Sequence, residues 1–254
     1  MKISIIGSGN TATVIGKLLK EHHHTIKEVV GRDANAVHAL AENLNAQPCT
    51  DIKTINMESN IYIIAVSDDA VAAISASLKF NNKIVAHTCG SVTMNVLENT
   101  SENFGVFYPL QSLRKELNYT PAIPFLIDGN NTFTKQALAE LAGSVSENVM
   151  EANDEMRLNY HLSAIIVSNF SNHLFALAKQ YCDAHHTDFN LLLPLIEETV
   201  NRLHYYDPSN MQTGPAARGD EAVIQKHLQL LNDAPELKAI YAMMSESIQQ
   251  RYKK

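Results

Sequence analysis

The feature that most constrains the fold is a glycine-rich turn at the start of the chain. Residues 3–6 (ISII) form a short apolar run, and apolar residues recur at helical spacing from residue 14 onward. This order predicts a strand, a tight turn and a helix, the opening of a dinucleotide-binding βαβ unit. The predicted cofactor-binding residues of the turn are Gly7, Ser8, Gly9, Asn10, Thr11 and Ala12.

The positions within this turn have separate physical roles. Gly7 lets the backbone leave the strand sharply, and Gly9, which has no Cβ, lets a diphosphate approach the main chain. Ala12 stands where a third glycine is usual and is small enough for the helix to pack on the strand. The helix N-terminus offers unpaired N–H groups and a positive dipole end, so we expect the cofactor phosphates there.

Composition excludes several classes of protein. The chain has 254 residues, enough for one large or two modest domains, and a net charge of −7, which gives no basic surface for nucleic acid. Its three cysteines are widely spaced and suggest neither a disulfide framework nor a metal site. With no targeting signal and no membrane-length apolar run, we expect a cytoplasmic protein.

The end of the second predicted strand, 25–30, indicates the choice of cofactor. NAD enzymes place an acidic residue there to hold the ribose hydroxyl, but this chain has Gly31 and Arg32. A guanidinium matches a phosphate, so we favour NADP over NAD. The alternative is that Arg32 is a solvated loop charge. We expect Asp33 to cap the helix over 34–44.

The run 61–66 (IYIIAV) is typical of a strand covered on both faces of a parallel sheet. Ligands bind outside the carboxyl ends of such strands. We therefore expect Val66, Ser67 and Asp68 to line the cofactor. Asp68 is equally compatible with capping the helix that follows.

The next predicted strand, 83–86, ends in His87 and Thr88 at the same edge of the sheet. Either residue is a candidate contact to cofactor or substrate, and the alternative is a turn histidine without a role. Cys89 is a reactive thiol only if a neighbour lowers its pKa. The later pattern predicts strands over 103–108, 125–128 and 144–150 and a helix over 133–143.

Strand patterns largely stop near residue 153, and residues 155–185 carry one long helical pattern that is apolar nearly all round. We expect this helix to be buried, in its own domain or in a dimer. The predicted fold is α/β: a doubly wound, mostly parallel Rossmann sheet over 1–152 and an all-helical domain over 153–254.

Polar residues interrupt the apolar surface of this helix. At about 100° per residue, His161, Ser168 and Asn172 fall within roughly 40° of one another, with Asn169 on the neighbouring flank. Buried polar groups need partners, so the line faces either a substrate cleft or another helix in the core. In the first case His161 is the preferred proton donor, and the other three position the substrate.

The loop 213–220 (TGPAARGD) is rich in turn residues and carries one arginine. One interpretation is that Arg218 grips an anionic substrate or a cofactor phosphate while Thr213 and Asp220 fix the loop. The other is a rigid turn in which Asp220 caps the next helix and Arg218 makes a structural ion pair.

Seven segments together resemble a known family: GSGNTA, VVGRD, AVSDDAV, AHTCGS, FYPLQSL, YHLSAIIVSN and TGPAARGD. They are similar to NADP-dependent oxidoreductases with a Rossmann-like N-terminal domain and a helical C-terminal domain of unknown function. That group is similar in build to pyrroline-5-carboxylate reductase, ketopantoate reductase, the 6-phosphogluconate and 3-hydroxyacid dehydrogenases and the deazaflavin-dependent NADP reductases.

The resemblance implies a two-domain NADP enzyme with a small-molecule substrate, forming a homodimer through the helical domain, and it names no substrate. The chain departs in one respect from the 3-hydroxyacid dehydrogenases, whose long helix carries an Asn followed three residues later by a catalytic Lys. Placing that Asn on Asn169 puts Asn172 at the lysine position. Lysine-dependent alcohol oxidation is therefore not expected.

These observations favour an oxidoreductase that transfers hydride between NADP and a small C=O, C=N or C–OH substrate in the cleft between the domains. The alternative is a non-catalytic NADP(H)-binding sensor or partner protein. Electron exchange with a deazaflavin is a third hypothesis.

Overall fold

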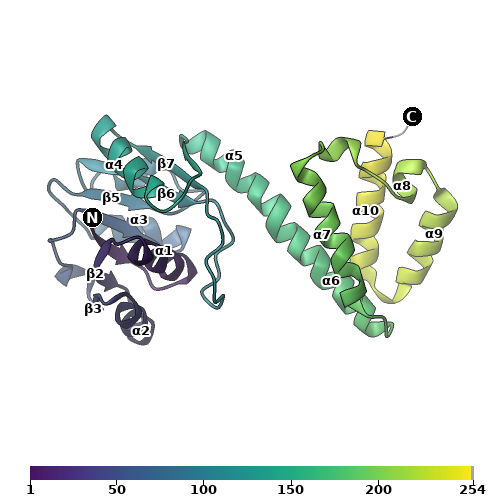
Figure 1. Cartoon of the computed structure of the whole chain (residues 1–254), viewed down its shortest axis with the longest axis horizontal. Helices are drawn as coiled ribbons and strands as arrows, with labels where there is room; N and C mark the ends of the chain where they lie inside the picture. The colour runs from purple at the N-terminus through teal and green to yellow at the C-terminus, as the bar shows by residue number, and fades with distance from the viewer. Residues whose placement is uncertain (253–254) are drawn as a thin grey trace. The chain divides into compact units, whose positions relative to one another are not determined.

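The computed structural model describes residues 1–252. The chain divides into two compact units, Met1–Ser168 and a helical unit that begins at Asn169. Figure 1 shows an N-terminal unit in which helices surround a sheet and a C-terminal unit built from helices. The two units are described separately below.

The N-terminal unit contains an eight-stranded sheet with the order β3-β2-β1-β4-β5-β6-β7-β8. Strands β1 to β6 are parallel, whereas β7 is antiparallel to β6 and parallel to β8. The first six positions, 3-2-1-4-5-6, have the doubly wound Rossmann order, so the predicted fold class is confirmed. The strands are β1 (Lys2–Ile6), β2 (Thr25–Val30), β3 (Gln47–Cys49), β4 (Ile61–Ile64), β5 (Ile84–His87), β6 (Asn103–Pro109), β7 (Phe125–Gly129) and β8 (Val149–Glu151).

Apolar residues on both faces of the central strands are buried. Ile3 and Ile5 of β1 join a core cluster with helix α1 on one face, and Ile6 joins a second cluster on the other. A strand packed on both faces needs apolar side chains at successive positions, which explains the runs 3–6 and 61–66. The helices of this unit before residue 153 are α1 (Asn10–Glu21), α2 (Ala34–Leu44), α3 (Asp68–Ala76) and α4 (Thr132–Gly143).

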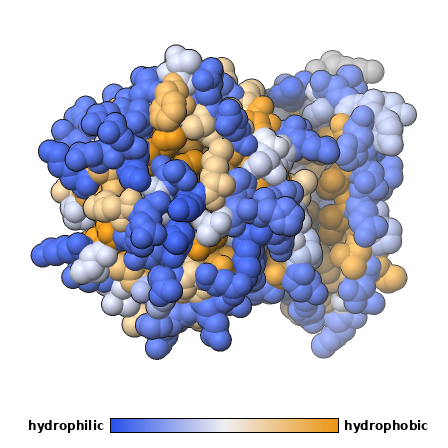
Figure 2. Space-filling view, turned by 60° about the vertical axis from the view of Figure 1, so that its left-hand side comes forward, coloured by the Kyte–Doolittle hydropathy of each residue, from blue (hydrophilic) through white to orange (hydrophobic). Residues whose placement is uncertain are grey.

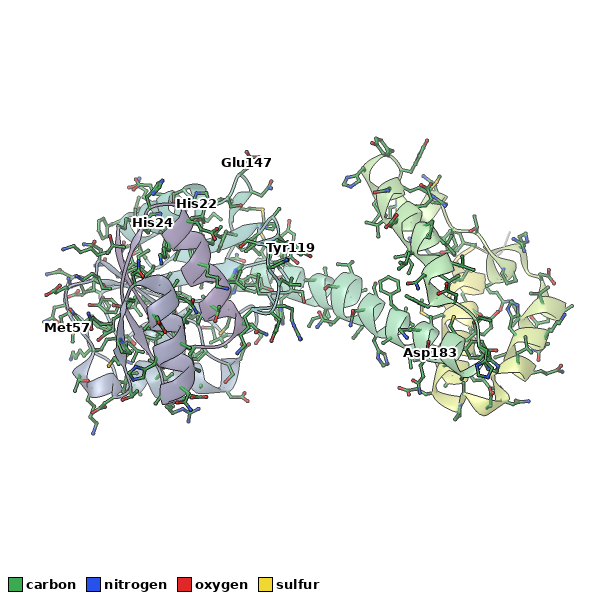
Figure 3. All side chains as sticks on the ribbon, turned by 60° about the horizontal axis from the view of Figure 1, so that its bottom comes forward. His22, His24, Met57, Tyr119, Glu147 and Asp183 are labelled. Atoms are coloured by element: carbon green, nitrogen blue, oxygen red, sulfur yellow. The ribbon has the colours of Figure 1, made fainter. Side chains whose placement is uncertain are left out.

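Two features of the sheet differ from what the sequence pattern predicted. Strand β3 was not predicted, because three residues that include Pro48 do not resemble a strand; the proline is accommodated because β3 lies at the edge of the sheet. The reversed direction of β7 was not predicted either. It follows the loop 110–124, where Tyr119, labelled in Figure 3, is 64% exposed.

The long helical pattern after residue 153 consists of three segments: α5 (Asp154–Ala164), a π-helical segment (Ile165–Phe170) and α6 (Ser171–Ala184). Hydrogen bonds in a π-helix join residues five apart, so the spacing of 100° per residue does not hold across it. The predicted alignment of His161 with Ser168 and Asn172 is therefore wrong.

The expected burial of this helical segment is wrong for the single chain. Leu162 is 56% exposed and Val167 is 71% exposed. A helix that is apolar nearly all round is buried when it has partners, and the single chain leaves these side chains open. Burial in a dimer therefore stays a proposal.

The helical unit consists of α6 with α7 (Leu193–Asn201), α8 (Pro215–Arg218), α9 (Glu221–Leu230) and α10 (Pro235–Tyr252). Its small buried core includes Leu177, Ala216, Ile224 and Leu231. Hydrophobic side chains also reach the molecular surface, as the orange areas of Figure 2 show.

Among residues 1–252, no helix combines the length and apolar character that a membrane span requires.

Candidate functional site

A cavity of about 610 Å³ opens at the carboxyl ends of β1, β2 and β4 in the N-terminal unit. It brings together predicted cofactor-binding residues from three separate segments, which are Gly7, Ser8, Arg32, Val66 and Ser67. This edge of a doubly wound sheet is where dinucleotides bind, because the connections diverge there and leave a crevice. We call it the cofactor cavity.

The glycine turn at this cavity has the geometry that the sequence predicted. Gly7 has a φ of +131°, and a Cβ there would lie 2.1 Å from the carbonyl oxygen of Ala65. A Cβ on Gly9 would meet no atom within 4 Å, so open space adjoins the main chain. Gly9 is the N-cap of α1 and provides no side-chain cap, which leaves the first helical N–H groups available to phosphate oxygens.

The other predicted residues of the turn belong to the first turn of α1. Ala12 is fully buried and packs in the core between helix and sheet. Asn10 accepts a hydrogen bond from the backbone N–H of Lys115 at 3.4 Å, which ties the loop 110–124 to the start of α1. Thr11 is half-buried. A diphosphate fits this arrangement because small residues and free N–H groups face the open space.

Arg32 lies on the wall of the cofactor cavity with an exposed side chain. Within the described part of the chain, no ion pair involves it. Asp33 accepts the N–H of Ala36 at 3.1 Å and caps α2, as the sequence predicted. The Asp33 carboxylate at the end of β2 is therefore occupied as the cap of α2, and the Arg32 guanidinium is available to bind an anion.

A second group of side chains lies where β4, β5 and β6 end. We call it the strand-end cluster: Asp68, His87, Cys89, Ser91, Tyr108, Arg157 and His161. At its centre, the Tyr108 hydroxyl oxygen and His161 Nδ1 are 2.9 Å apart. Their rings meet edge to face with centroids 5.9 Å apart. The strand ends thus bring a phenol and an imidazole into one hydrogen bond.

Gly90 makes this pair possible by leaving room for the histidine ring. A Cβ on Gly90 would lie 2.6 Å from both Cγ and Nδ1 of His161. Such a contact is far inside van der Waals distance, so the ring occupies the space that any other residue would fill.

Asp68 is exposed and lies in the first turn of α3, whose N-cap is Ser67, so Asp68 is not the cap. It accepts a hydrogen bond from the Ser91 hydroxyl. Burial and the charge of Asp68 raise the pKa of the Cys89 thiol. Cys89 is therefore a neutral thiol and not an activated nucleophile.

His87 and Thr88 lie in the interior. Burial, together with the positive charge of Arg157, lowers the pKa of His87 to about 4. Its Nδ1 accepts the backbone N–H of Cys89 at 3.2 Å, and Nε2 is buried without a partner among the described residues. The Thr88 hydroxyl faces the carbonyl of Ile64 at 3.5 Å. The predicted contact of either residue with a ligand stays a prediction.

Arg157, a member of the cluster, anchors the first turn of α5. It is 1% exposed, and its Nη2 donates to Asp154 Oδ1 at 2.8 Å and to the carbonyl of Val92. Asp154 also accepts the N–H of Met94 at 3.1 Å. Because His161 follows Arg157 by one helical turn, the anchor places the imidazole beside the loop that contains Gly90.

Several predicted residues lie outside these two groups. Ser168 ends the N-terminal unit, and Asn169 and Asn172 belong to the helical unit with exposed side chains. Asp220 caps α9 by accepting the N–H of Val223 at 3.2 Å. Arg218 and Thr213 are exposed, and residues 1–252 offer Arg218 no ion pair. The capping interpretation thus holds for Asp220, and the structural ion pair does not.

The sequence interpretation missed Tyr108, Arg157 and Gly90. Tyr108 is the last residue but one of β6, and its polar hydroxyl near the carboxyl edge of the sheet was the signal that could have identified it. Nothing in the sequence marked Arg157 as special, because an arginine in a helical pattern is usually on the surface and only its 1% exposure in the structure distinguishes it.

A larger cavity of about 700 Å³ lies between α1 and the loop 110–124. It contains none of the strand-end cluster, so we do not assign the site there.

The glycine turn, the cofactor cavity and the Rossmann order define a nicotinamide-nucleotide-binding oxidoreductase fold. Residues 2–88 match the family of coenzyme F420-dependent NADP oxidoreductases, and residues 123–248 match a domain of unknown function, DUF2520. A candidate NADP oxidoreductase from Bacteroides fragilis is 35% identical, with 98% of each chain covered and a TM-score of 0.91. The chain belongs to this family of Rossmann-fold oxidoreductases with a DUF2520 domain.

More distant structures share the fold. The protein TM1727 from Thermotoga maritima is 18% identical, with 99% of this chain and 100% of that chain covered and a TM-score of 0.81. An imine reductase from Myxococcus stipitatus, in complex with NADP⁺, is 14% identical, with 100% and 94% covered and a TM-score of 0.64. A pyrroline-5-carboxylate reductase from Streptococcus pyogenes is 15% identical, with 98% of each chain covered and a TM-score of 0.62. The comparison with curated proteins found no match.

Proposed function

We propose that this protein is an NADP-dependent oxidoreductase that transfers hydride between the nicotinamide and a small C=O, C=N or C–OH substrate. The observation that carries the proposal is that the cofactor cavity and the strand-end cluster lie at the carboxyl edge of one sheet. Val66 and Ser67, which line the cavity, directly precede Asp68 of the cluster. A dinucleotide whose diphosphate rested on the glycine turn would extend along this edge toward the cluster.

The preference for NADP rests on Arg32. Its guanidinium adjoins the cofactor cavity without a carboxylate partner in the described chain, and the nearby Asp33 is occupied as a helix cap. A planar fork of donors binds a phosphate in two hydrogen bonds, whereas a ribose hydroxyl calls for a carboxylate. The imine reductase relative bound to NADP⁺ supports the same choice.

When bound, the nicotinamide supplies or accepts the hydride. The protein's part is to bind the substrate beside it and to provide a proton. His161 is the donor that we propose, because its ring lies in the strand-end cluster and is half-buried. The buried positive charge of Arg157 favours negative charge that develops on nearby groups. Substrate positioning by Ser168, Asn169 and Asn172 stays part of this proposal.

The substrate class that deserves the first test is a C=N compound. Two relatives of the same fold are an imine reductase and a pyrroline-5-carboxylate reductase. The exposed carboxylate of Asp68 in the cluster favours the positive charge that a C=N group gains as it takes up a proton, because opposite charges attract. Keto acids and hydroxy acids are the second group of substrates to test.

The test combines binding with turnover. NADPH and NADH are titrated by fluorescence, and a panel of cyclic imines, keto acids and hydroxy acids, with a deazaflavin added, is assayed by the change in NADPH absorbance. We expect tighter binding of NADPH and turnover of a C=N substrate, with His161→Gln lowering kcat by about 10²–10⁴-fold. Absence of binding to either nucleotide overturns the proposal. Tight NADPH binding without turnover favours the sensor or partner protein instead.

We also propose that the chain forms a homodimer through its helical unit. Large apolar side chains on and after α7 are exposed: Leu195 by 60%, Leu203 by 58% and Tyr205 by 80%. Exposed apolar surface of this kind marks interaction sites, and a second copy of the chain offers a matching one. Light scattering coupled to size exclusion measures the mass directly, and a monomer at micromolar concentration contradicts the proposal.

A further inference from the structure

The His161 ring is held from two sides in the N-terminal unit. Tyr108 approaches one nitrogen, with its hydroxyl oxygen 2.9 Å from Nδ1. The backbone of Gly90 lies against the ring, where a Cβ would be 2.6 Å from Nδ1. No protein group among residues 1–252 forms a hydrogen bond with the other nitrogen, Nε2, which is not among the buried unpaired atoms. The ring therefore has one nitrogen, Nδ1, that is hydrogen-bonded to Tyr108 and one, Nε2, that is free to bind a ligand.

The direction of the Tyr108–His161 hydrogen bond decides which nitrogen carries the proton. A neutral imidazole has one N–H group and one acceptor nitrogen. If Nδ1 donated to Tyr108, the phenolic O–H would need another acceptor, and the described residues provide none within hydrogen-bond distance. Tyr108 is only 8% exposed, so an unpaired O–H would be costly. The arrangement that satisfies both groups has the phenol donating to Nδ1.

We propose that Tyr108 is a positioning residue that fixes His161 in the tautomer with its proton on Nε2, and that Gly90 keeps the ring within reach of Tyr108. The inference rests on the proposed function, because the Nε2–H is then the group presented to the substrate. A neutral imidazole in this state donates a hydrogen bond to the heteroatom on which negative charge develops.

Each proton that moves in the proposed reaction passes between Tyr108, His161 and the substrate. As the carbon of a neutral C=O or C=N substrate takes the hydride, the N–H bond at Nε2 breaks and the heteroatom–H bond forms. The phenolic proton passes to Nδ1, so the imidazole stays neutral and the negative charge rests on the Tyr108 oxygen until solvent returns a proton. Burial and the Asp68 carboxylate raise the pKa of Tyr108, and the positive charge of Arg157 opposes them. The pKa of Tyr108 is raised on balance, so the phenolate takes a proton back from solvent, and Arg157 only lessens the cost of forming it.

The tautomer is measured directly by nitrogen NMR of the ligand-free protein labelled with ¹⁵N-histidine near pH 8. In the wild type we expect His161 to show a protonated Nε2 and an unprotonated Nδ1. Tyr108→Phe removes the donor, so both signals should move toward the average of the two tautomers. Gly90→Ala should give the same change with Tyr108 still present, because the added Cβ displaces the ring.

Matched controls separate this effect from general damage. Tyr241→Phe removes the hydroxyl 2.8 Å from Nδ1 of His227 in the helical unit, and it should leave the His161 signals unchanged. Gly143→Ala adds a Cβ that meets no atom within 4 Å, and it should also leave them unchanged. If Gly90→Ala does not fold, Tyr108→Phe decides alone.

A wild-type proton on Nδ1, or an unchanged tautomer in Tyr108→Phe, overturns the inference. Because this readout needs neither cofactor nor substrate, a correct tautomer in a chain that binds no NADPH refutes the proposed function and not the tautomer. Once a substrate is found, Tyr108→Phe should lower kcat roughly tenfold with little change in KM. An unchanged kcat contradicts the positioning role.

Discussion

Alanine substitution at Gly7 and Gly9 should affect stability and binding separately, although the two residues stand two positions apart. Gly7 has a φ of +131°, and its added Cβ would lie 2.1 Å from the carbonyl oxygen of Ala65. The strained backbone costs about 1–3 kcal/mol and the overlap about as much again. The free energy of unfolding should therefore fall by roughly 2–6 kcal/mol, which lowers Tm by about 4–24 °C.

Gly9→Ala is the matched control for the same added methyl group. Its Cβ would meet no protein atom within 4 Å, and its φ of −82° suits any residue. We expect a loss of stability below about 1 kcal/mol. The methyl group enters the space proposed for the diphosphate, so NADPH affinity should fall about tenfold or more, which is at least about 1.4 kcal/mol of binding free energy.

Urea and thermal unfolding measure the first effect, and calorimetric titration with NADPH measures the second. Two results would refute the reasoning. A Gly7→Ala variant as stable as the wild type would mean that the turn does not have the tight geometry described. A Gly9→Ala variant that binds NADPH as the wild type does would mean that the diphosphate does not rest on this turn.

Three further perturbations test other parts of the site. Arg32→Ala should weaken NADPH about 10- to 100-fold and leave NADH within about twofold, because only NADP has the extra phosphate. Burial holds the pKa of His87 at about 4 against an ordinary 6.5, so the unfolded chain takes up the proton first. Stability should therefore fall by about 3 kcal/mol between pH 6.5 and 4, and His87→Gln should flatten that slope. Leu195→Glu should turn a dimer into a monomer.

Each of these three predictions has a control variant or a result that would contradict it. Arg114→Ala removes an exposed arginine that does not line the cofactor cavity and should leave both nucleotides unaffected. Equal loss of NADPH and NADH in Arg32→Ala would contradict the phosphate contact. An unaltered pH slope of unfolding in His87→Gln would contradict the buried neutral histidine. Light scattering that shows the same mass for Leu195→Glu and the wild type would place the interface elsewhere.

The fold class was predictable because its determinants are local. The glycine turn, the arginine after the second strand and the continuous apolar strands each have a signature a few residues long. Chirality and strand order then follow general rules for βαβ units. The helix caps at Asp33 and Asp220 were predictable for the same reason, since a cap involves residues three apart.

The strand-end cluster was only partly predictable. His161 stood out as a polar residue on an apolar helix, but its alignment with Ser168 and Asn172 failed at the π-helical segment. No periodicity in the sequence marks one added residue in a helical turn, because the hydrophobic pattern on either side stays helical. The direction of β7 depends likewise on how the loop 110–124 packs.

The sequence by itself determined a Rossmann sheet with a nucleotide turn and an arginine beside it, because those features are encoded by neighbouring residues. Only the tertiary structure decided that Tyr108 meets His161, which is 53 positions further along the chain, in the space left by Gly90. Such a contact depends on packing between a strand end, a loop and a helix, and packing is specified by the whole core and not by local pattern.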